Sequence, residues 1–123
     1  MIQANELRIG NIVDRLDYYC KVISIDAKGI VLEPINYKGE RFIEQKVKPI
    51  NITESFLFYF GAKEWKHIRY RTFKLGILMI GSTDNMRTFE IIDLYMKPIK
   101  YVHELQNLYF SLTGKELKQL KQT

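Results

Sequence analysis

The sequence predicts an α+β protein in which a twisted, mainly antiparallel sheet packs against one main C-terminal helix and a short middle helix. Two patterns favour this class. Short runs of β-branched and aromatic residues are separated by turn residues, and one long helical repeat of apolar residues lies near the C-terminus. A length of 123 residues with 46 % hydrophobic content is enough for one core, so we expect a single compact domain over residues 1–123.

The N-terminal third has the composition of short strands. The runs "LRIGNIVD" and "YYCKVISID" are rich in β-branched and aromatic residues, and "GIVLEP" follows them as a third run. The segment "DAKG" at 26–29 is typical of a hairpin connection, because its glycine tolerates positive φ. Tight turns between short strands predict an SH3-like N-terminal half. After a loop at 35–41, "RFIEQKVKPI" predicts a further strand or sheet edge.

The middle segment "NITESFLFYFG" at 51–61 allows two interpretations, a buried strand or a short buried helix. Thr53 as N-cap, Glu54 in the first turn and Gly61 as stop favour the helix. The segments 64–81 and 86–96 then predict strands joined by a hairpin loop at 81–85, with Gly76 as a bulge or turn.

The C-terminal segment predicts the main helix, from Tyr101 to Thr113, ended by Gly114. Apolar residues recur there at helical spacing and are expected to be buried: Leu105, Leu108 and Leu112. Polar residues fall mostly on the opposite, solvent side: His103, Glu104, Gln106 and Asn107. Thr113 and Glu116 have the spacing of a capping box, which allows a short final helix over 115–120.

The stretch "YVHELQN" invites comparison with the zinc-protease helix H-E-x-x-H. That motif needs a second imidazole four residues after the first, but Asn107 stands there instead. The only other histidine is His67, and the only cysteine is Cys20, which we expect to be a small buried side chain. We therefore predict no catalytic residues, no metal site and no cofactor. A small ribonuclease using His67 or His103 is the weakest alternative.

Charge and composition restrict the partners and the compartment. The formal net charge is +5, and residues 63–100 carry eight basic and four acidic groups against four and five in residues 1–33. This asymmetry favours a face that attracts phosphates or acidic protein surfaces. A lone cysteine excludes an intramolecular disulfide, and no stretch has the length of a signal peptide core or a spanning helix. We expect a soluble, cytoplasmic protein.

The stretch "KEWKHIRYRTFK" carries the candidate binding site. On a continuous strand, alternate residues would share one face: Trp65, His67, Arg69, Arg71 and Phe73. A ring and guanidinium groups suit RNA as well as protein interfaces. We predict a partner- or RNA-binding site composed of Trp65, Arg69 and Arg71, with weaker contributions from Lys63, Lys66 and Lys74. The alternative is structural: Trp65 in the core, or arginines satisfied by nearby carboxylates.

Three segments resemble a group of small proteins found in bacteriophages, prophages and other mobile elements: "NELRIGNIV", "PINITESFLFYFG" and "IKYVHELQNLYFSLTGKEL". The resemblance follows the whole chain in order and implies no catalytic residues. It implies instead a protein that binds and disables a host defence system, such as an anti-CRISPR protein that binds a CRISPR effector or its guide RNA complex. The alternative is an accessory module of a mobile element that binds nucleic acid directly.

Overall fold

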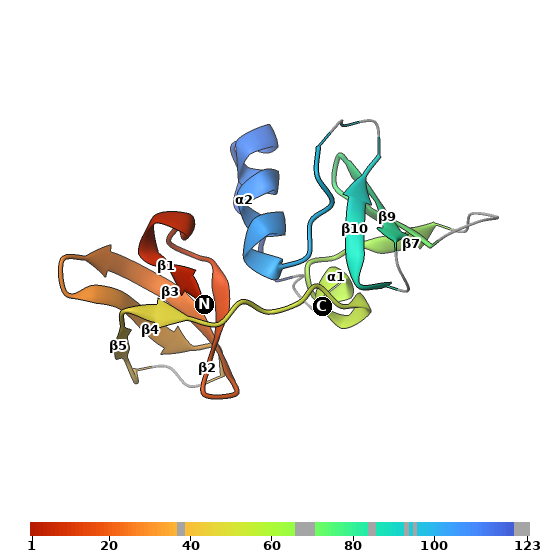
Figure 1. Cartoon of the computed structure of the whole chain (residues 1–123). Coiled ribbons are helices and arrows are strands. Elements are labelled where there is room, and N and C mark those ends of the chain that lie inside the picture. The colour runs from red at the N-terminus through yellow and green to blue at the C-terminus, as the bar shows by residue number, and fades with distance from the viewer. Residues whose placement is uncertain (37–38, 66–70, 84–85, 93, 95, 120–123) are drawn as a thin grey trace.

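The computed structural model describes residues 1–36, 39–65, 71–83, 86–92, 94 and 96–119. The architecture is α+β, as predicted. Within the described residues, the strands form two four-stranded antiparallel sheets and one two-stranded sheet, accompanied by two α-helices. The C-terminal helix stands between the two four-stranded sheets (Figure 1).

The N-terminal half consists of short strands and one turn of 3-10 helix. In chain order the elements are β1 (Ile2–Gln3), η1 (Ala4–Glu6), β2 (Ile12–Arg15), β3 (Tyr18–Asp26), β4 (Gly29–Pro34), β5 (Phe42–Glu44) and β6 (Lys46–Val47). Strands β2 to β5 pair in sequence order, and β1 pairs with β6. A bridge between Asp14 and Lys48 joins the outer edge of β2 to the chain after β6, so this sheet curls toward closure as expected.

The curled N-terminal sheet has a core of its own. Inward-facing side chains from several strands form it: Ile2, Leu7, Val13, Cys20, Val22, Ile30, Leu32 and Val47. Cys20 is fully buried, and this burial raises the pKa of its thiol, so the side chain behaves as the small apolar residue predicted. The turn between β2 and β3 places Leu16 and Asp17 at φ 50° and 68°, a left-handed conformation that Leu rarely adopts.

The second half contains a four-stranded sheet and both helices. Its elements are α1 (Glu54–Tyr59), β7 (Lys63–Trp65), β8 (Thr72–Leu75), β9 (Leu78–Thr83), β10 (Thr88–Ile91) and α2 (Val102–Thr113). The strand order is β10-β9-β8-β7. Phe73, Ile80 and Phe89 point to one face of this sheet and are fully buried in a second core with Leu57 of α1 and Leu105 of α2. Both helices therefore cover the same face.

The short middle helix is confirmed, and the strand alternative for this segment is wrong. Thr53 Oγ1 accepts a hydrogen bond from the Phe56 N–H at 3.2 Å, which is the expected N-cap. Phe56 and Leu57 are buried, and Gly61 follows the helix at φ 91°. The local capping signals thus decided between the two interpretations.

The main helix is confirmed as well. Glu104 Oε1 accepts the backbone N–H groups of Lys100 and Tyr101 at 3.0 and 2.9 Å, so this carboxylate caps the helix N-terminus. Gly114 ends the helix at φ 72°, with its N–H donating to the Phe110 carbonyl at 2.8 Å.

The burial pattern of α2 differs from the prediction. Leu105 is fully buried and Leu108 half-buried, but Leu112 is 45 % exposed, so its predicted burial is wrong. Conversely, His103 and Gln106 are buried although they were assigned to the solvent side. The reason is that this side of the helix faces the start of the chain rather than water.

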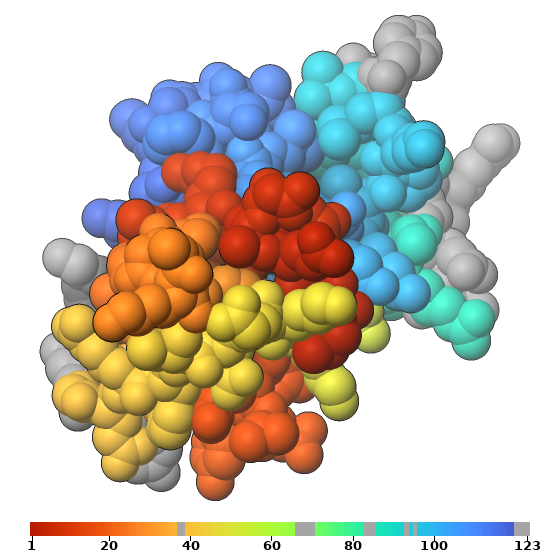
Figure 2. Space-filling view, turned by 60° about the vertical axis from the view of Figure 1, so that its left-hand side comes forward, coloured from red at the N-terminus to blue at the C-terminus, as the bar shows by residue number. Residues whose placement is uncertain are grey.

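A polar clamp joins α2 to the start of β2. Gln106 Oε1 accepts the Ile12 N–H at 2.8 Å, while Gln106 Nε2 donates to the Gly10 carbonyl at 3.0 Å. Beside it, Asn11 Nδ2 donates to Asn107 Oδ1 at 2.9 Å. Figure 2 shows α2 in blue against the red N-terminal segment. These hydrogen bonds join the segments "ELRIGN" and "HELQN", which carry much of the resemblance noted above. The bonded residues therefore stabilise the fold.

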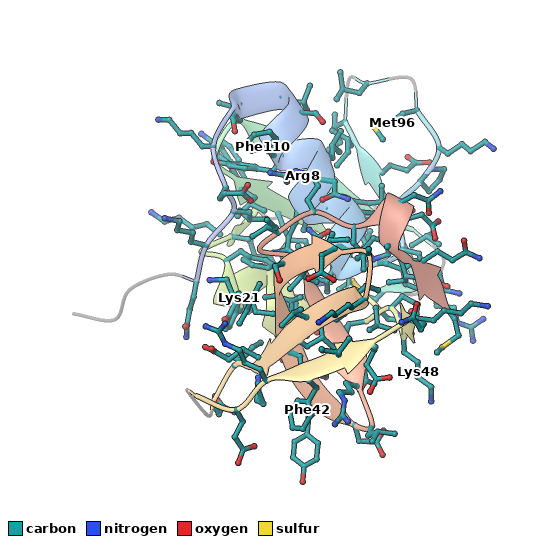
Figure 3. The ribbon with its side chains drawn as sticks, turned by 90° about the vertical axis from the view of Figure 1, so that its left-hand side faces the viewer. Arg8, Lys21, Phe42, Lys48, Met96 and Phe110 are labelled. Atoms are coloured by element: carbon teal, nitrogen blue, oxygen red, sulfur yellow. The ribbon has the colours of Figure 1, made fainter. Side chains whose placement is uncertain are left out.

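The predicted final helix over 115–120 is wrong for residues 115–119, which form no helix. Its last position, residue 120, lies outside the described residues. Leu117 is instead buried in the second core. Glu116 pairs with Arg8, whose guanidinium lies 3.7 Å from the centre of the Phe110 ring (Figure 3). These contacts hold the segment against the molecule.

Several strand boundaries also differ from the prediction. The segment 41–50 contains two short strands, β5 and β6, and among the described residues of 86–96 the strand is β10. Gly76, at φ 59°, makes the turn between β8 and β9 as expected. The loop predicted at 81–85 is wrong for its first three residues, which belong to β9, and its other two lie outside the described residues. No helix among the described residues is long and apolar enough to cross a membrane.

Candidate binding surface on the second sheet

The segment that carries the predicted site is a hairpin, not one continuous strand. β7 and β8 run antiparallel, with Lys63 opposite Lys74 and Trp65 opposite Thr72. The predicted continuous strand over these residues is therefore wrong. Folding back pairs the backbone of each strand with the other, whereas a single long strand at the sheet edge would leave one side unpaired. Lys66, His67 and Arg69 lie outside the described residues.

The hairpin separates two residues that were predicted to point the same way. Residues directly opposite on paired strands share a face, so Lys63, Trp65 and Lys74 lie on the outer face of the sheet. Arg71 has the alternation of Phe73, on the inner face, and its guanidinium lies 5.2 Å from the centre of the Phe73 ring. Trp65 and Arg71 therefore do not form one surface.

Arg71 is committed to carboxylates. Its Nη1 and Nη2 atoms bond the two oxygens of Glu54 at 3.1 and 2.7 Å, and its Nε and Nη2 atoms bond those of Glu64 at 2.8 and 2.6 Å. The contact with Glu54 ties the residue before β8 to α1, and its hydrogen bonds lower the pKa of Glu54. For this arginine the structural alternative holds, and its guanidinium is already satisfied.

Trp65 is not a core residue. Its side chain is 55 % exposed, and the Lys74 ammonium lies 5.6 Å from the ring centre. The strand register places further residues on the same outer face in rows across the sheet. One row runs Trp65, Thr72, Gly81 and Glu90, and a neighbouring row runs Lys63, Lys74 and Met79. Both helices pack on the opposite face. On this outer face Thr72 and Gly81 are buried, whereas Lys63, Trp65, Lys74 and Glu90 are exposed.

The outer face of β7–β10 combines an exposed ring with uncommitted positive charge. Among the described residues, neither Lys63 nor Lys74 forms an ion pair, although both are exposed. We call this surface, defined by Lys63, Trp65, Lys74 and Met79, the outer sheet face. Sequence reasoning found three of its members but missed Met79, because its place depends on the β8–β9 register.

The described residues offer little for catalysis. No group of three His, Cys, Asp or Glu side chains among them could hold a metal ion. Glu104 caps a helix, and His103 is buried against Tyr101, whose ring stacks on it at 5.8 Å. Burial lowers the pKa of His103, which favours the neutral imidazole. Glu104 and His103 therefore have structural roles at the start of α2.

Comparison with known proteins finds no protein-family model that matches the sequence, no similar curated protein and no matching solved structure.

Proposed function

We propose that this chain is a non-enzymatic binding protein that engages its partner through the outer sheet face. The observation that carries the proposal is the exposure of Trp65 beside two lysines that have no ion-pair partner among the described residues. An exposed tryptophan offers a large rigid contact area, whether to a protein pocket or to an unpaired base. The lysines add attraction that weakens with salt.

The proposed partner is a host protein–RNA complex, with a CRISPR effector and its guide RNA as the first candidate. The resemblance to proteins of mobile elements supplies this context, and the net charge of +5 supports docking on an acidic or phosphate-bearing surface. A mimic of DNA would need the opposite charge. Direct binding of single-stranded nucleic acid, as an accessory module of a mobile element, is the second candidate, because the outer sheet face pairs a stacking ring with two cations.

Affinity purification from a host that carries the defence system tests the proposal, followed by identification of the bound protein and RNA. Binding to the captured partner is then compared between the wild type and Trp65→Ala. The matched control is Tyr18→Ala, which removes a ring that is 60 % exposed on the other sheet. We expect Trp65→Ala to lose about tenfold or more in affinity, because losing a stacked base costs about 1–3 kcal/mol and losing a central hot spot about 2 kcal/mol or more. Equal loss in both variants, or none in either, contradicts the proposal.

Salt dependence separates the two candidate partners. If phosphates of a single strand contact Lys63 and Lys74, the double variant Lys63→Ala/Lys74→Ala lowers the slope of log affinity against log salt by about 1.4, or about 0.7 for each contact. If a protein surface is the partner, Trp65→Ala raises the off-rate with little change in that slope. Lys28→Ala/Lys46→Ala, two exposed lysines on the N-terminal half, is the charge-matched control.

A further inference from the structure

A concave surface, separate from the outer sheet face, lies between the curled N-terminal sheet, the end of α1 and the segment 115–119. Its volume is about 1010 Å³, at the upper end of what small-molecule sites occupy and enough for a short stretch of another chain. Lys21 and Ile25 of β3 form one wall, and Tyr59 of α1 another. We call it the C-terminal groove.

The floor and rim of the C-terminal groove are rich in branched apolar side chains. Ile12 and Leu117 are buried at its base, and Ile25 and Ile35 are half-buried along it. Ile9 stands at the rim and is 61 % exposed, although the segment around it is tightly held by the polar clamp. A fixed, exposed isoleucine beside an apolar hollow favours an occupant with apolar side chains of its own.

The uncommitted charge around the C-terminal groove is positive. Both carboxylates of its lining already have cationic partners, Glu116 with Arg8 and Glu33 with Arg41 at 3.9 Å. Lys21 and Lys118 are exposed and form no ion pair in the part of the chain that the structure describes. Charge complementarity therefore calls for carboxylates on the occupant.

We propose that the C-terminal groove binds an acidic amphipathic segment of a partner protein, with its apolar side chains on Ile9 and Ile35 and its carboxylates on Lys21 and Lys118. A second copy of this chain fits less well, because the chain is basic and would bring like charges together. RNA fits less well too, because the isoleucine-rich floor offers few flat rings for stacking. The C-terminal groove does not include Trp65, so this proposal can be tested separately from the one for the outer sheet face.

The test is selection of short random peptides from a yeast-displayed library against the full chain, followed by titration of the synthesised winners. We expect enriched peptides to combine apolar residues with Asp or Glu. The variant Lys21→Ala/Lys118→Ala should weaken them by about tenfold or more at low salt. Ile9→Asp should abolish binding, since it places a carboxylate on the apolar rim. Lys28→Ala/Lys46→Ala and Trp65→Ala should bind them as the wild type does.

A second measurement locates the peptide on the wild-type protein and so does not depend on whether a variant folds. Addition of a selected peptide to the isotope-labelled wild type should shift amide resonances of Ile9, Lys21 and Ile35 in NMR spectra, and leave those of the outer sheet face unchanged. Failure to enrich any peptide, enrichment of neutral or basic peptides, or undiminished binding to the double lysine variant would each overturn the proposal. So would a dimer in sedimentation that Ile9→Asp dissociates, because the occupant would then be a second copy.

Discussion

The two four-stranded sheets of this protein bury their apolar residues in different ways. The sheet β2–β5 curls on itself, with β1 and β6 completing the enclosure of a core that contains Val13, Val22 and Leu32. The sheet β7–β10 stays open and relies on α1 and α2 to cover one face. The difference separates scaffold from surface: the curled sheet uses its inner side for its own core, whereas the open sheet has an outer face on which Lys63, Trp65 and Lys74 are exposed.

The largest expected effect is on the covered face of the open sheet. Leu105→Ala should lower the free energy of unfolding by about 2–5 kcal/mol, because this side chain is fully buried in the second core and its loss leaves a cavity. Urea denaturation measures this loss of unfolding free energy.

Leu112→Ala is the control on the same helix. At 45 % exposure it should change stability by less than about 0.5 kcal/mol. Equal effects in the two variants would mean that α2 does not pack as described.

The next effect concerns the polar clamp between the two halves. Gln106→Leu keeps the side-chain volume but leaves the Ile12 N–H and the Gly10 carbonyl without their partner. We expect a loss of about 2–3 kcal/mol, because unpaired buried backbone groups keep their desolvation penalty. Hydrogen exchange at the Ile12 amide should accelerate more than at amides in the middle of β3. Uniform acceleration throughout the chain would show that the variant unfolds globally and would argue against a local clamp.

A smaller effect, of opposite sign, is expected in the curled sheet. Leu16 and Asp17 adopt positive φ in the β2–β3 turn, where a two-residue hairpin of this kind normally carries Asn-Gly. Leu16→Asn combined with Asp17→Gly should therefore raise stability by about 1 kcal/mol, because it removes the steric cost of the left-handed leucine. Thermal unfolding measures the gain. An unchanged or lowered midpoint would indicate that the leucine contributes a contact that offsets its strain.

The smallest effect is a pH dependence at the joint between the halves. Burial lowers the pKa of His103 below its ordinary value of 6.5, against the opposing influence of Glu104 and Glu6. The unfolded chain therefore takes up the proton first, so the contribution of neutral His103 is full above pH 6.5 and is lost as the pH falls below it. Wild type should lose more stability than His103→Gln between pH about 7.5 and about 5. Parallel pH profiles of the two proteins would contradict this assignment.

The elements that the sequence predicts well are those set by neighbours along the chain. Thr53 and Gly114 mark helix ends through bonds to residues three or four positions away, and the turn at 26–29 closes a hairpin of adjacent strands. The burial of Gln106 could not be predicted, because its partners lie 94 and 96 residues earlier. A polar residue on an amphipathic helix is normally solvated, and only the distant strand edge makes its burial favourable.

The candidate site was predictable in composition but not in arrangement. The spacing of Trp65 and Arg71 is the same on one strand and across a hairpin, yet the reversal between them puts the two side chains on opposite faces. The commitment of Arg71 depends on Glu54, which lies on a helix 17 residues away. Lys63 and Lys74 are exposed, because a lysine side chain needs no partner to be stable in water, and their part in binding stays a prediction.

The Gln106 clamp has a consequence for how the chain is made. Two sets of hydrogen bonds pair the outer edge of β2: backbone bonds between Asp14 and Lys48, and the bond from the Ile12 N–H to Gln106. Gln106 is synthesised 94 residues after Ile12. At a synthesis rate of about 5–20 residues per second, roughly 5–19 seconds pass between the two. During that interval the nascent N-terminal sheet shows an incompletely paired strand edge, to which another nascent chain can add. Helix α2 therefore completes the pairing of this strand edge only at the end of that interval.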